Sequence, residues 1–484
     1  MTDVSYDART GRVVEEIPTS TLSEVDAVLA AAAAVAPVAA ATPPATRKSW
    51  LYAIAAALEV PETVDELVAL ADRETGLGEE RLRMEVGRAP IQLRYYADVA
   101  VEGSYVDVTV DAGPPRLARM RVPLGPVAVF GASNFPFLFS VLGTDTGSAL
   151  AAGCPVVAKA HPAHPALSAR LGELALAALA SDDAPAGLFA LVSGFDAGSR
   201  LVRSPNTAAV AFTGSQRGGL ALWRMANERD VVIPVFAEMG TVNPVVVTPA
   251  GVSSSLATGF VESFTRGTGQ YCTKPGLLFA PAGSDMATQV TEALRGLAPS
   301  AWLLTSQIAD AAVEGVGELV AAGGTIAGQV PAPESGWTAP ATVLTVPIEK
   351  LTSGSRLLEE CFGPVAIVTE YRDRAELEAA LDELQGTLAA AVMAGDADPD
   401  VPWLVDRLSK LAGRVTVNDW PTGVAVSGAQ HHGGPWPSTT NPATTSVGAA
   451  ALTRFTRPVA YQNVPEAALP PALQESNPWH LPRR

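Results

Sequence analysis

The residues of this chain best suited to chemistry are a cysteine and a glutamate. Cys272 lies between Gly269 and Pro275, which indicate a tight loop, and a cysteine on a loop is a candidate nucleophile. A lone cysteine is also often a small buried hydrophobic residue, and Cys154, at the start of an apolar run, fits that alternative. Glu238 directly follows an apolar run, so it is a candidate general base or a structural acid.

Two further polar groups follow apolar runs in the same way. Lys159 ends such a run and could hold a hydroxyl or phosphate group, or lie on the surface. Residues 212–219 read as strand, glycine turn and helix, which presents free backbone N–H groups to a phosphate, although a plain turn has the same pattern. In parallel sheets, ligands bind at the carboxyl ends of strands, where Glu238 is expected.

The composition excludes several classes of protein. The 484 residues suffice for two to four domains of roughly 100–200 residues each. Apolar residues make up 48% and the net charge is −17, which disfavours disorder, nucleic-acid binding and attachment to anionic membranes. Three cysteines suit a reducing compartment. The longest apolar run, 27–41, is interrupted by Pro37, and no signal peptide is visible, so we expect a cytoplasmic protein.

The pattern of short strands and helices favours an α/β fold. We expect strands at 127–130, 156–158, 188–192, 208–212, 235–237 and 245–247, with helices at 166–180, 218–227 and 375–384. Before them we expect an irregular segment over 1–20, helices at 21–35, 46–58, 63–75 and 79–101, and a hairpin over 105–122. Pro37 should end the first helix, and the Gly- and Pro-rich segment 418–447 should be a long ordered loop.

Six segments occur in the order seen in aldehyde dehydrogenases, and the chain resembles that superfamily from about residue 10 to residue 465. The segments are 131–136, the strand ending at Lys159, 213–215, 238–240, 270–272 and 359–364. The resemblance implies two Rossmann-like parallel-sheet domains plus a small β oligomerisation element. It assigns 1–104 and 124–239 to a cofactor-binding domain, 240–446 to a catalytic domain, and 105–123 with 447–484 to the oligomerisation element and tail.

The resemblance also implies roles for individual residues. Cys272 is the nucleophile, Asn134 donates to the oxyanion, and Glu238 is the general base that activates water. The aldehyde becomes a thiohemiacetal and then a thioester, and hydrolysis rather than transfer to coenzyme A gives the acid. The implied nicotinamide-cofactor contacts are Lys159, His161, Gly214, Ser215, Arg217, Gly219, Gly240, Glu360 and Phe362. No metal is expected, because His431 and His432 are adjacent and point apart.

One departure from the family pattern bears on the cofactor. The family commonly has an acid three residues after the lysine, where it binds the adenosine 2′-hydroxyl, and here Pro162 holds that position. Without the carboxylate, a 2′-phosphate is not repelled, and His161, Lys159 or Arg217 could attract it. We therefore expect NADP to be used at least as well as NAD.

The residues within these motifs resemble those of one branch of the superfamily. That branch contains the 2,5-dioxovalerate (α-ketoglutaric semialdehyde) dehydrogenases and an NADP-dependent fatty aldehyde dehydrogenase. The expected reaction is therefore oxidation of 2,5-dioxovalerate to 2-oxoglutarate, or alternatively of medium- or long-chain aliphatic aldehydes. Candidate pocket residues are Phe135, Phe139 and Leu142, expected on a helix after Asn134, and Tyr271 and Thr273. Arg88 and Arg94 could bind a substrate carboxylate, or form surface salt bridges such as Glu85 with Arg88.

The hairpin would leave sheet edges exposed in a monomer, so we expect a homodimer or homotetramer. A different class of protein is also open: a catalytically silent cofactor-binding protein of the same fold. The complete set of Cys272, Glu238 and Asn134 argues against it.

Overall fold

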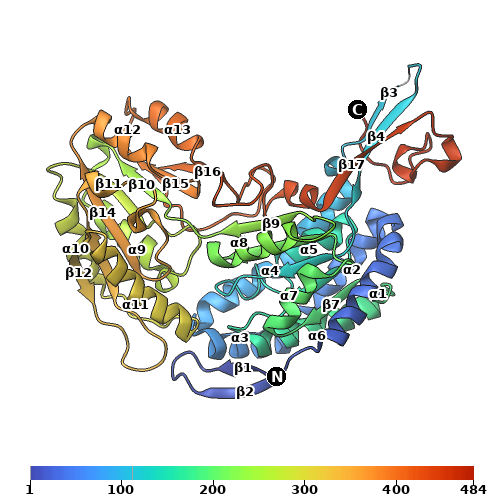
Figure 1. Cartoon of the computed structure of the whole chain (residues 1–484), viewed down its shortest axis with the longest axis horizontal. Helices are drawn as coiled ribbons and strands as arrows, with labels where there is room; N and C mark the ends of the chain where they lie inside the picture. Colours follow the sequence, from blue (N-terminus) through green and yellow to red (C-terminus); the bar gives the residue numbers. More distant parts are fainter. Residues whose placement is uncertain (1, 112) are drawn as a thin grey trace.

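The computed structural model describes residues 2–111 and 113–484. Its first domain is built on a five-stranded parallel sheet in the order β7-β6-β5-β8-β9 (Figure 1). The strands are β5 (Val127–Phe130), β6 (Val156–Lys159), β7 (Phe189–Val192), β8 (Ala209–Gly214) and β9 (Val235–Met239). All the strands expected there are present, each within two residues of its expected bounds.

Helices cover both faces of this sheet, which explains its unbroken apolar strands. One face packs on α2 (Pro44–Ala57), α4 (Glu79–Glu102), α5 (Thr144–Ala152) and α6 (Pro165–Ser181), with α3 (Pro61–Thr75) beside them. The other packs on α1 (Leu22–Ala41), α7 (Phe195–Arg203) and α8 (Gln216–Asn227). Val127 and Val129 point to the first face and Ala128 to the second.

The second domain holds a seven-stranded sheet in the order β12-β13-β14-β11-β10-β15-β16, parallel except for β12. Its strands are β10 (Pro244–Val247), β11 (Leu277–Pro281), β12 (Thr325–Val330), β13 (Ala341–Thr345), β14 (Val365–Tyr371), β15 (Thr387–Met393) and β16 (Ala412–Val417). One face is covered by α9 (Leu256–Thr265) and α10 (Met286–Leu297), the other by α11 (Ser306–Ala321), α12 (Arg374–Asp382) and α13 (Val401–Ser409).

A three-stranded antiparallel sheet projects from the first domain (Figure 1). The expected hairpin forms β3 (Thr109–Asp111) and β4 (Leu117–Pro123), and β17 (Thr456–Gln462) pairs with β4 along seven residues. Residue 112, inside the hairpin, lies outside the described residues. The element thus joins two segments more than 300 residues apart, while the domain boundaries given above stay a prediction.

Two expectations near the N-terminus were wrong. Residues 1–20 are not irregular in their described part, because β1 (Thr2–Tyr6) and β2 (Val13–Pro18) form an antiparallel hairpin. Pro37 does not end α1, which continues to Ala41. Buried Val35 and Ala39 flank Pro37, so packing outweighs a local cost of about 3 kcal/mol.

Helix α1 is long and apolar enough to cross a bilayer by length and composition alone. Its buried stripe, however, packs on the first sheet: Val25, Leu29 and Ala32 lie in one cluster with Ala128 of β5. Such packing is what a core helix of a folded domain requires.

Candidate active site

Cys272 lies on a loop whose backbone is anchored by hydrogen bonds from a neighbouring side chain. The chain leaves α9 through a 3₁₀ turn over Arg266–Gly269, in which Gly267 and Thr268 have positive φ. Asn243 Nδ2 then donates to the carbonyl oxygens of Cys272 (2.8 Å) and Lys274 (3.0 Å). The loop is therefore fixed, and the partly exposed Cys272 side chain faces a cleft.

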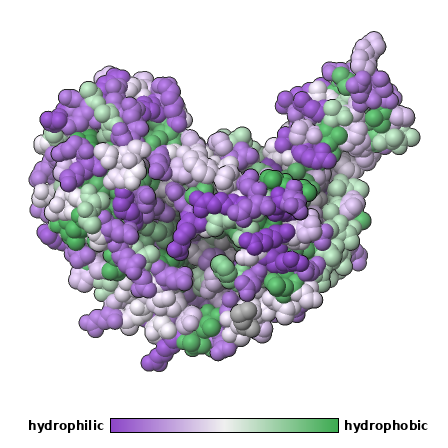
Figure 2. Space-filling view, viewed as in Figure 1, coloured by the Kyte–Doolittle hydropathy of each residue, from purple (hydrophilic) through white to green (hydrophobic). Residues whose placement is uncertain are grey.

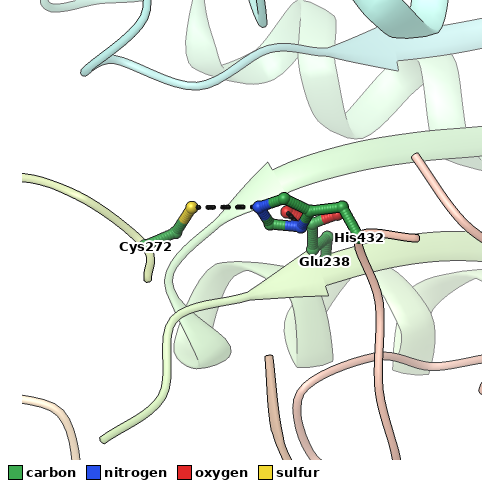
Figure 3. A group of neighbouring side chains, drawn as sticks. All are labelled: Glu238, Cys272 and His432. Atoms are coloured by element: carbon green, nitrogen blue, oxygen red, sulfur yellow. Dashed lines mark hydrogen bonds and ion pairs between the residues drawn. The ribbon is translucent and has the colours of Figure 1, made fainter. Parts of the chain in front are cut away.

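Figure 3 shows His432 between Cys272 and Glu238. Cys272 Sγ lies 3.6 Å from His432 Nε2, and the other ring nitrogen, Nδ1, lies 2.7 Å from Glu238 Oε1. The side chains of His432 and Glu238 are almost fully buried, and Ser446 Oγ donates to Glu238 Oε2 (2.5 Å). Glu238 is the penultimate residue of β9, near the carboxyl end where it was expected, whereas His432 comes from the long loop after β16.

The charges around His432 determine its protonation. Burial by itself lowers the pKa of His432, but Glu238 and Cys272 more than offset this and raise the pKa to about 10. A protonated His432 can donate to the sulfur through Nε2 while its Nδ1 faces the carboxylate. This is the geometry of a nucleophile oriented by a base that is itself oriented by an acid.

The same three residues offer atoms that lie within 4.8 Å of one another, and all three are possible metal ligands. However, Cys272 and Glu238 meet different nitrogens of one imidazole ring. A metal between Cys272 and Nε2 would leave the carboxylate behind the ring, where it orients the histidine instead of binding. The geometry therefore favours a proton relay over a metal site.

Asn134 lies beside the nucleophile loop, as expected. Its side chain is buried and its Nδ2 donates to Gln270 O (2.7 Å), two residues before Cys272. Segment 131–143 is not the expected helix but a series of turns. This compact segment places an amide donor in the cleft that Cys272 also lines.

Aromatic rings form a wall near Cys272. Phe135 packs edge-on against Phe139 (5.6 Å between centroids) and Tyr271 (5.1 Å), and Phe139 lies 6.1 Å from the His432 ring. Leu142, by contrast, belongs to the core of the first domain, and Thr273 is buried behind the nucleophile.

The arginines expected to bind a substrate carboxylate differ in their surroundings. Arg94 is engaged in an ion pair with Glu59. Arg88 donates to Val424 O (3.1 Å) in the long loop and is partly exposed. The expected alternative, an Arg88–Glu85 salt bridge, is not formed within the described residues, although the Arg88 charge acts on Glu85.

A cleft of about 630 Å³ runs from Cys272 between the two domains. Figure 2 shows the surface hollowed between the two lobes. All the expected cofactor residues except Gly219 line it. Gly219 lies beneath it on α8, where an added Cβ would come within 2.6 Å of Met239 Sδ.

Comparisons with known proteins now agree with this geometry. The aldehyde dehydrogenase family model matches residues 2–459. The chain belongs to the aldehyde dehydrogenase family. Alpha-ketoglutaric semialdehyde dehydrogenase 2 of Azospirillum brasilense is 44% identical over 92% of this chain and 87% of its own length. The Acinetobacter baylyi alpha-ketoglutaric semialdehyde dehydrogenase is 38% identical over 88% and 84%.

Solved structures show the same fold. Aldehyde dehydrogenase C of Pseudomonas syringae, solved as a variant with NAD⁺ and octanal, has a TM-score of 0.83 at 22% identity and covers 97% of this chain and 95% of its own. A Bacillus cereus aldehyde dehydrogenase has a TM-score of 0.82 at 22% identity, with coverages of 96% and 93%. The architecture expected from the sequence is thus confirmed.

The cleft of this aldehyde dehydrogenase fits a nicotinamide dinucleotide. Glu360 Oε1 is buried without a hydrogen-bond partner, as expected for an acceptor waiting for a ribose hydroxyl. Burial raises the pKa of Glu360 to about 7, with the Lys274 and Arg356 charges opposing it. A Cβ at Gly240 would lie 2.0 Å from Glu360 Oε2, so a larger residue there would displace the Glu360 carboxylate.

At the other end of the cleft, the N-terminus of α8 suits a phosphate group. Ser215 Oγ accepts from Gly218 N (3.2 Å) and so caps the helix. Arg217, in the first turn, is exposed and lines the cleft. Phe362 lines it on the side of Glu360.

The basic side chains near Pro162 have lower pKa values than their residue types suggest. Burial, His164 and Lys159 hold the pKa of His161 well below its usual range, so His161 is neutral. Its Nδ1 accepts from Ala163 N (3.0 Å), which leaves the proton on Nε2 as a donor. Burial also lowers the pKa of Lys159, against the opposing charge of Asp3.

The sequence interpretation missed two residues that hold this site together. His432 was considered only as half of a metal pair with His431. A histidine in a Gly- and Pro-rich loop, in a chain with a candidate nucleophilic cysteine, was the signal that could have identified it. The buried Lys274 was given no role. Its Nζ donates to Cys361 O (2.9 Å) and Val365 O (2.6 Å), which ties the nucleophile loop to the segment that carries Glu360 and Phe362.

Proposed function

We propose that this aldehyde dehydrogenase oxidises 2,5-dioxovalerate to 2-oxoglutarate with NADP, without coenzyme A. The chemical part of the proposal rests on the position of His432 between Cys272 and Glu238. This arrangement provides both an activated thiol and a base for water. The two relatives named above support the substrate, since their names give the semialdehyde of α-ketoglutarate and their matches extend over most of this chain.

The first half of the reaction uses the thiolate. A protonated His432 donates to the sulfur and so favours the thiolate as nucleophile. Cys272 Sγ adds to the aldehyde carbon, and the resulting oxyanion accepts hydrogen bonds from Asn134 Nδ2 and the Cys272 backbone N–H. One such donor contributes on the order of 3 kcal/mol. Phe362 and Glu360 line the cleft where they would hold the nicotinamide ring and its ribose, and the bound cofactor would supply the hydride acceptor. Loss of the hydride from the adduct leaves a thioester on Cys272.

The second half hydrolyses the thioester. Once the sulfur is acylated, His432 loses one of the two negative charges that raise its pKa, so it gives up its Nε2 proton more readily. Water then attacks the thioester carbonyl, its proton passes to His432 Nε2, and the C–S bond breaks. Glu238, expected from the sequence to be the general base, has in this proposal the role of keeping the His432 ring oriented through Nδ1. The products are the carboxylic acid and the starting thiolate–imidazolium pair.

NADP use is supported by the cleft wall near Lys159. Pro162 lines the cleft where the family commonly has an acid, and the carboxylates among the lining residues are Glu238 and Glu360, on the catalytic side. The Nε2–H of neutral His161 and the exposed Arg217 remain as donors for a 2′-phosphate. A dianionic phosphate would also favour protonation of His161.

For the substrate carboxylate we propose Arg88. It is partly exposed, and among the described residues its side chain donates to a backbone carbonyl and to no carboxylate, whereas Arg94 forms an ion pair with Glu59. The aromatic wall of Phe135, Phe139 and Tyr271 favours the second candidate, oxidation of medium- or long-chain aliphatic aldehydes. These two substrates place opposite demands on the pocket.

The deciding experiment measures NADPH and NADH formation with 2,5-dioxovalerate, succinic semialdehyde, hexanal and dodecanal. We expect the highest kcat/KM with 2,5-dioxovalerate and NADP. Arg88→Met should raise KM for 2,5-dioxovalerate about tenfold and leave hexanal unchanged, since one ion pair is removed. A higher kcat/KM for the alkyl aldehydes would overturn the substrate, and absence of turnover with every aldehyde would favour the silent protein.

We further propose that the enzyme is a cytoplasmic homodimer or homotetramer. The three-stranded sheet stands away from the rest of the chain, and β17 is an edge strand of it, which suits contact with another subunit. Light scattering on the eluting protein would measure the mass, and a monomer would contradict this proposal.

A further inference from the structure

Side chains of helix α4 form hydrogen bonds with the backbone of the segment that carries Asn134. Arg81 Nη2 donates to Asn134 O (2.6 Å). Glu85 Oε1 accepts from the backbone N–H groups of Phe137 (2.9 Å) and Leu138 (3.0 Å), and Gln92 Nε2 donates to Leu138 O (3.0 Å). One helix thus supplies partners for four backbone atoms within five residues.

The spacing of these side chains explains why they act together. Residues 81, 85 and 92 lie four and seven apart, so they occupy one face of the helix. Glu85 and Gln92 are 3% exposed, in the core between α4 and the first sheet. Polar residues at such positions are retained only where their hydrogen bonds offset the cost of burial.

Residues 131–143 form turns and bends instead of a helix or strand. Some of their backbone groups pair within the segment, such as Ala132 N with Phe139 O and Phe139 N with Phe135 O, but Asn134 O and the N–H groups of Phe137 and Leu138 find their partners on α4. The position of Asn134, and hence of its Nδ2 beside Gln270 O, therefore depends on α4.

Arg81 also connects the two sides of the nucleophile. Its guanidinium lies 5.1 Å from the Phe135 ring and 4.9 Å from the Tyr271 ring, one residue from Asn134 and Cys272 respectively. Burial raises the pKa of Glu85 to about 7, and the charges of Arg81 and Arg88 oppose that rise. The side chains of Arg81 and Glu85 thus interact electrostatically next to the segment that carries Asn134.

We propose that Arg81, Glu85 and Gln92 are positioning residues, which hold Asn134 where it stabilises the oxyanion. The proposal rests on the role given to Asn134 above. None of the three needs to touch the aldehyde, because each acts through the backbone of 134–138.

The chain provides a matched control on the other side of the cleft. Glu74 of α3 is also fully buried, and its carboxylate accepts from two successive backbone N–H groups, of Ala166 (3.0 Å) and Leu167 (2.9 Å), at the start of α6. That segment follows His161–His164, on the cofactor side. Loss of either carboxylate leaves two N–H groups without an acceptor, and loss of Glu74 also leaves the Ser5 hydroxyl without one, so Glu74→Met should be destabilised at least as much as Glu85→Met.

The test compares Glu85→Met with Glu74→Met in the full-length enzyme. We expect Glu85→Met to lower kcat for the aldehyde about tenfold, with KM for NADP within twofold, because a small displacement of a catalytic donor is costly. Glu74→Met should raise KM for NADP with kcat largely kept. Glu85→Gln retains an acceptor and should restore kcat to within about threefold of the unmodified enzyme.

A double-mutant cycle with Asn134→Ala then separates positioning from general damage. If Glu85 acts through Asn134, the tenfold loss in kcat should shrink to less than about twofold in the Asn134→Ala background. Arg81→Met, at a less buried position, repeats the cycle should Glu85→Met fail to fold. An undiminished loss in the Asn134→Ala background, or equal kcat losses for the two glutamate variants, overturns the proposal. Full activity of Asn134→Ala alone would instead overturn the role of Asn134.

Discussion

The two ends of the cleft contain histidines with opposite electrostatics. At the catalytic end, a glutamate and a cysteine raise the pKa of His432 to about 10 despite complete burial. At the cofactor end, His161 and His164 stack 5.0 Å apart beside Lys159, and burial lowers the pKa of both, that of His164 to about 4. Burial acts in the same direction at both ends, so the neighbouring charges account for the difference.

The difference suits the charge that each end has to stabilise. A thiolate needs a proton donor before the substrate binds. At the catalytic end, the nearby charges of Glu238 and Cys272 favour the protonated form of His432. A phosphate brings its own negative charge, so neutral His161 suffices there until the cofactor binds. The predictions below test this contrast, from the largest expected effect to the smallest.

Removing the sulfur should abolish catalysis and leave the cofactor end intact. Cys272→Ala should lower kcat by about 10⁴-fold or more, because no covalent intermediate can form. NADP should bind with an unchanged Kd, measured by quenching of protein fluorescence or by calorimetry. A variant that retained turnover would show that Cys272 is not the nucleophile.

Removing the catalytic histidine tests its contact with the sulfur. His432→Asn should lower kcat by about 10²- to 10³-fold, since it removes an acid and base. Alkylation of Cys272 by iodoacetamide at neutral pH should be slower in His432→Asn than in the unmodified enzyme, because the hydrogen-bond donor beside the sulfur is lost.

The neighbouring His431 provides the control for that experiment. It is only partly buried, and His431→Asn should keep kcat within about twofold, as expected of a substitution away from the reacting atoms. Equal alkylation rates in the unmodified enzyme and His432→Asn would contradict an activating contact between His432 and the sulfur.

The regular part of this enzyme could be predicted from its sequence. Strand and helix positions follow from local apolar patterns, and both faces of each sheet are covered, as the unbroken apolar strands require. The failures came where distant packing decides. Pro37 is tolerated because α1 has buried residues on both sides of it, and the β1–β2 hairpin depends on pairing between short, largely exposed segments.

Site residues on strand ends could be predicted, while those delivered by irregular loops could not. Glu238 and Lys159 lie at the carboxyl ends of two strands of one parallel sheet, which places them at the same edge of it. His432 lies 160 residues from Cys272 in a loop without regular structure, and no periodicity fixes where its ring points. The same holds for the turns of 131–143, whose shape is set by Arg81, Glu85 and Gln92 of another element.

A carboxylate at residue 162 would give the cofactor end of the cleft a negative charge, as Glu238 does at the catalytic end. Pro162→Glu should lower kcat/KM with NADP by about 30-fold, because a like charge faces the 2′-phosphate, while NAD should change by less than about threefold. Pro162→Gln has the same shape without the charge and should keep the preference for NADP. Equal effects of Glu and Gln would show that shape, not charge, sets cofactor choice.

The smallest effect concerns stability, and its sign differs between the two ends. His164 has a pKa of about 4 in the folded chain and about 6.5 when unfolded, so between these values only the unfolded chain binds the proton. Its contribution to the free energy of unfolding is therefore full above pH 6.5 and falls with acidification, by up to about 1.4 kcal/mol per pH unit. His164→Gln should flatten the loss of stability between pH 6.5 and 4 by that amount, measured by urea unfolding, whereas His480→Gln in the exposed tail should leave the slope unchanged. For His432, with its raised pKa of about 10, the contribution is instead full below pH 6.5 and falls as the pH rises toward 10. If His164→Gln kept the acid slope, the neutral, charge-poor character assigned to the cofactor end would be wrong.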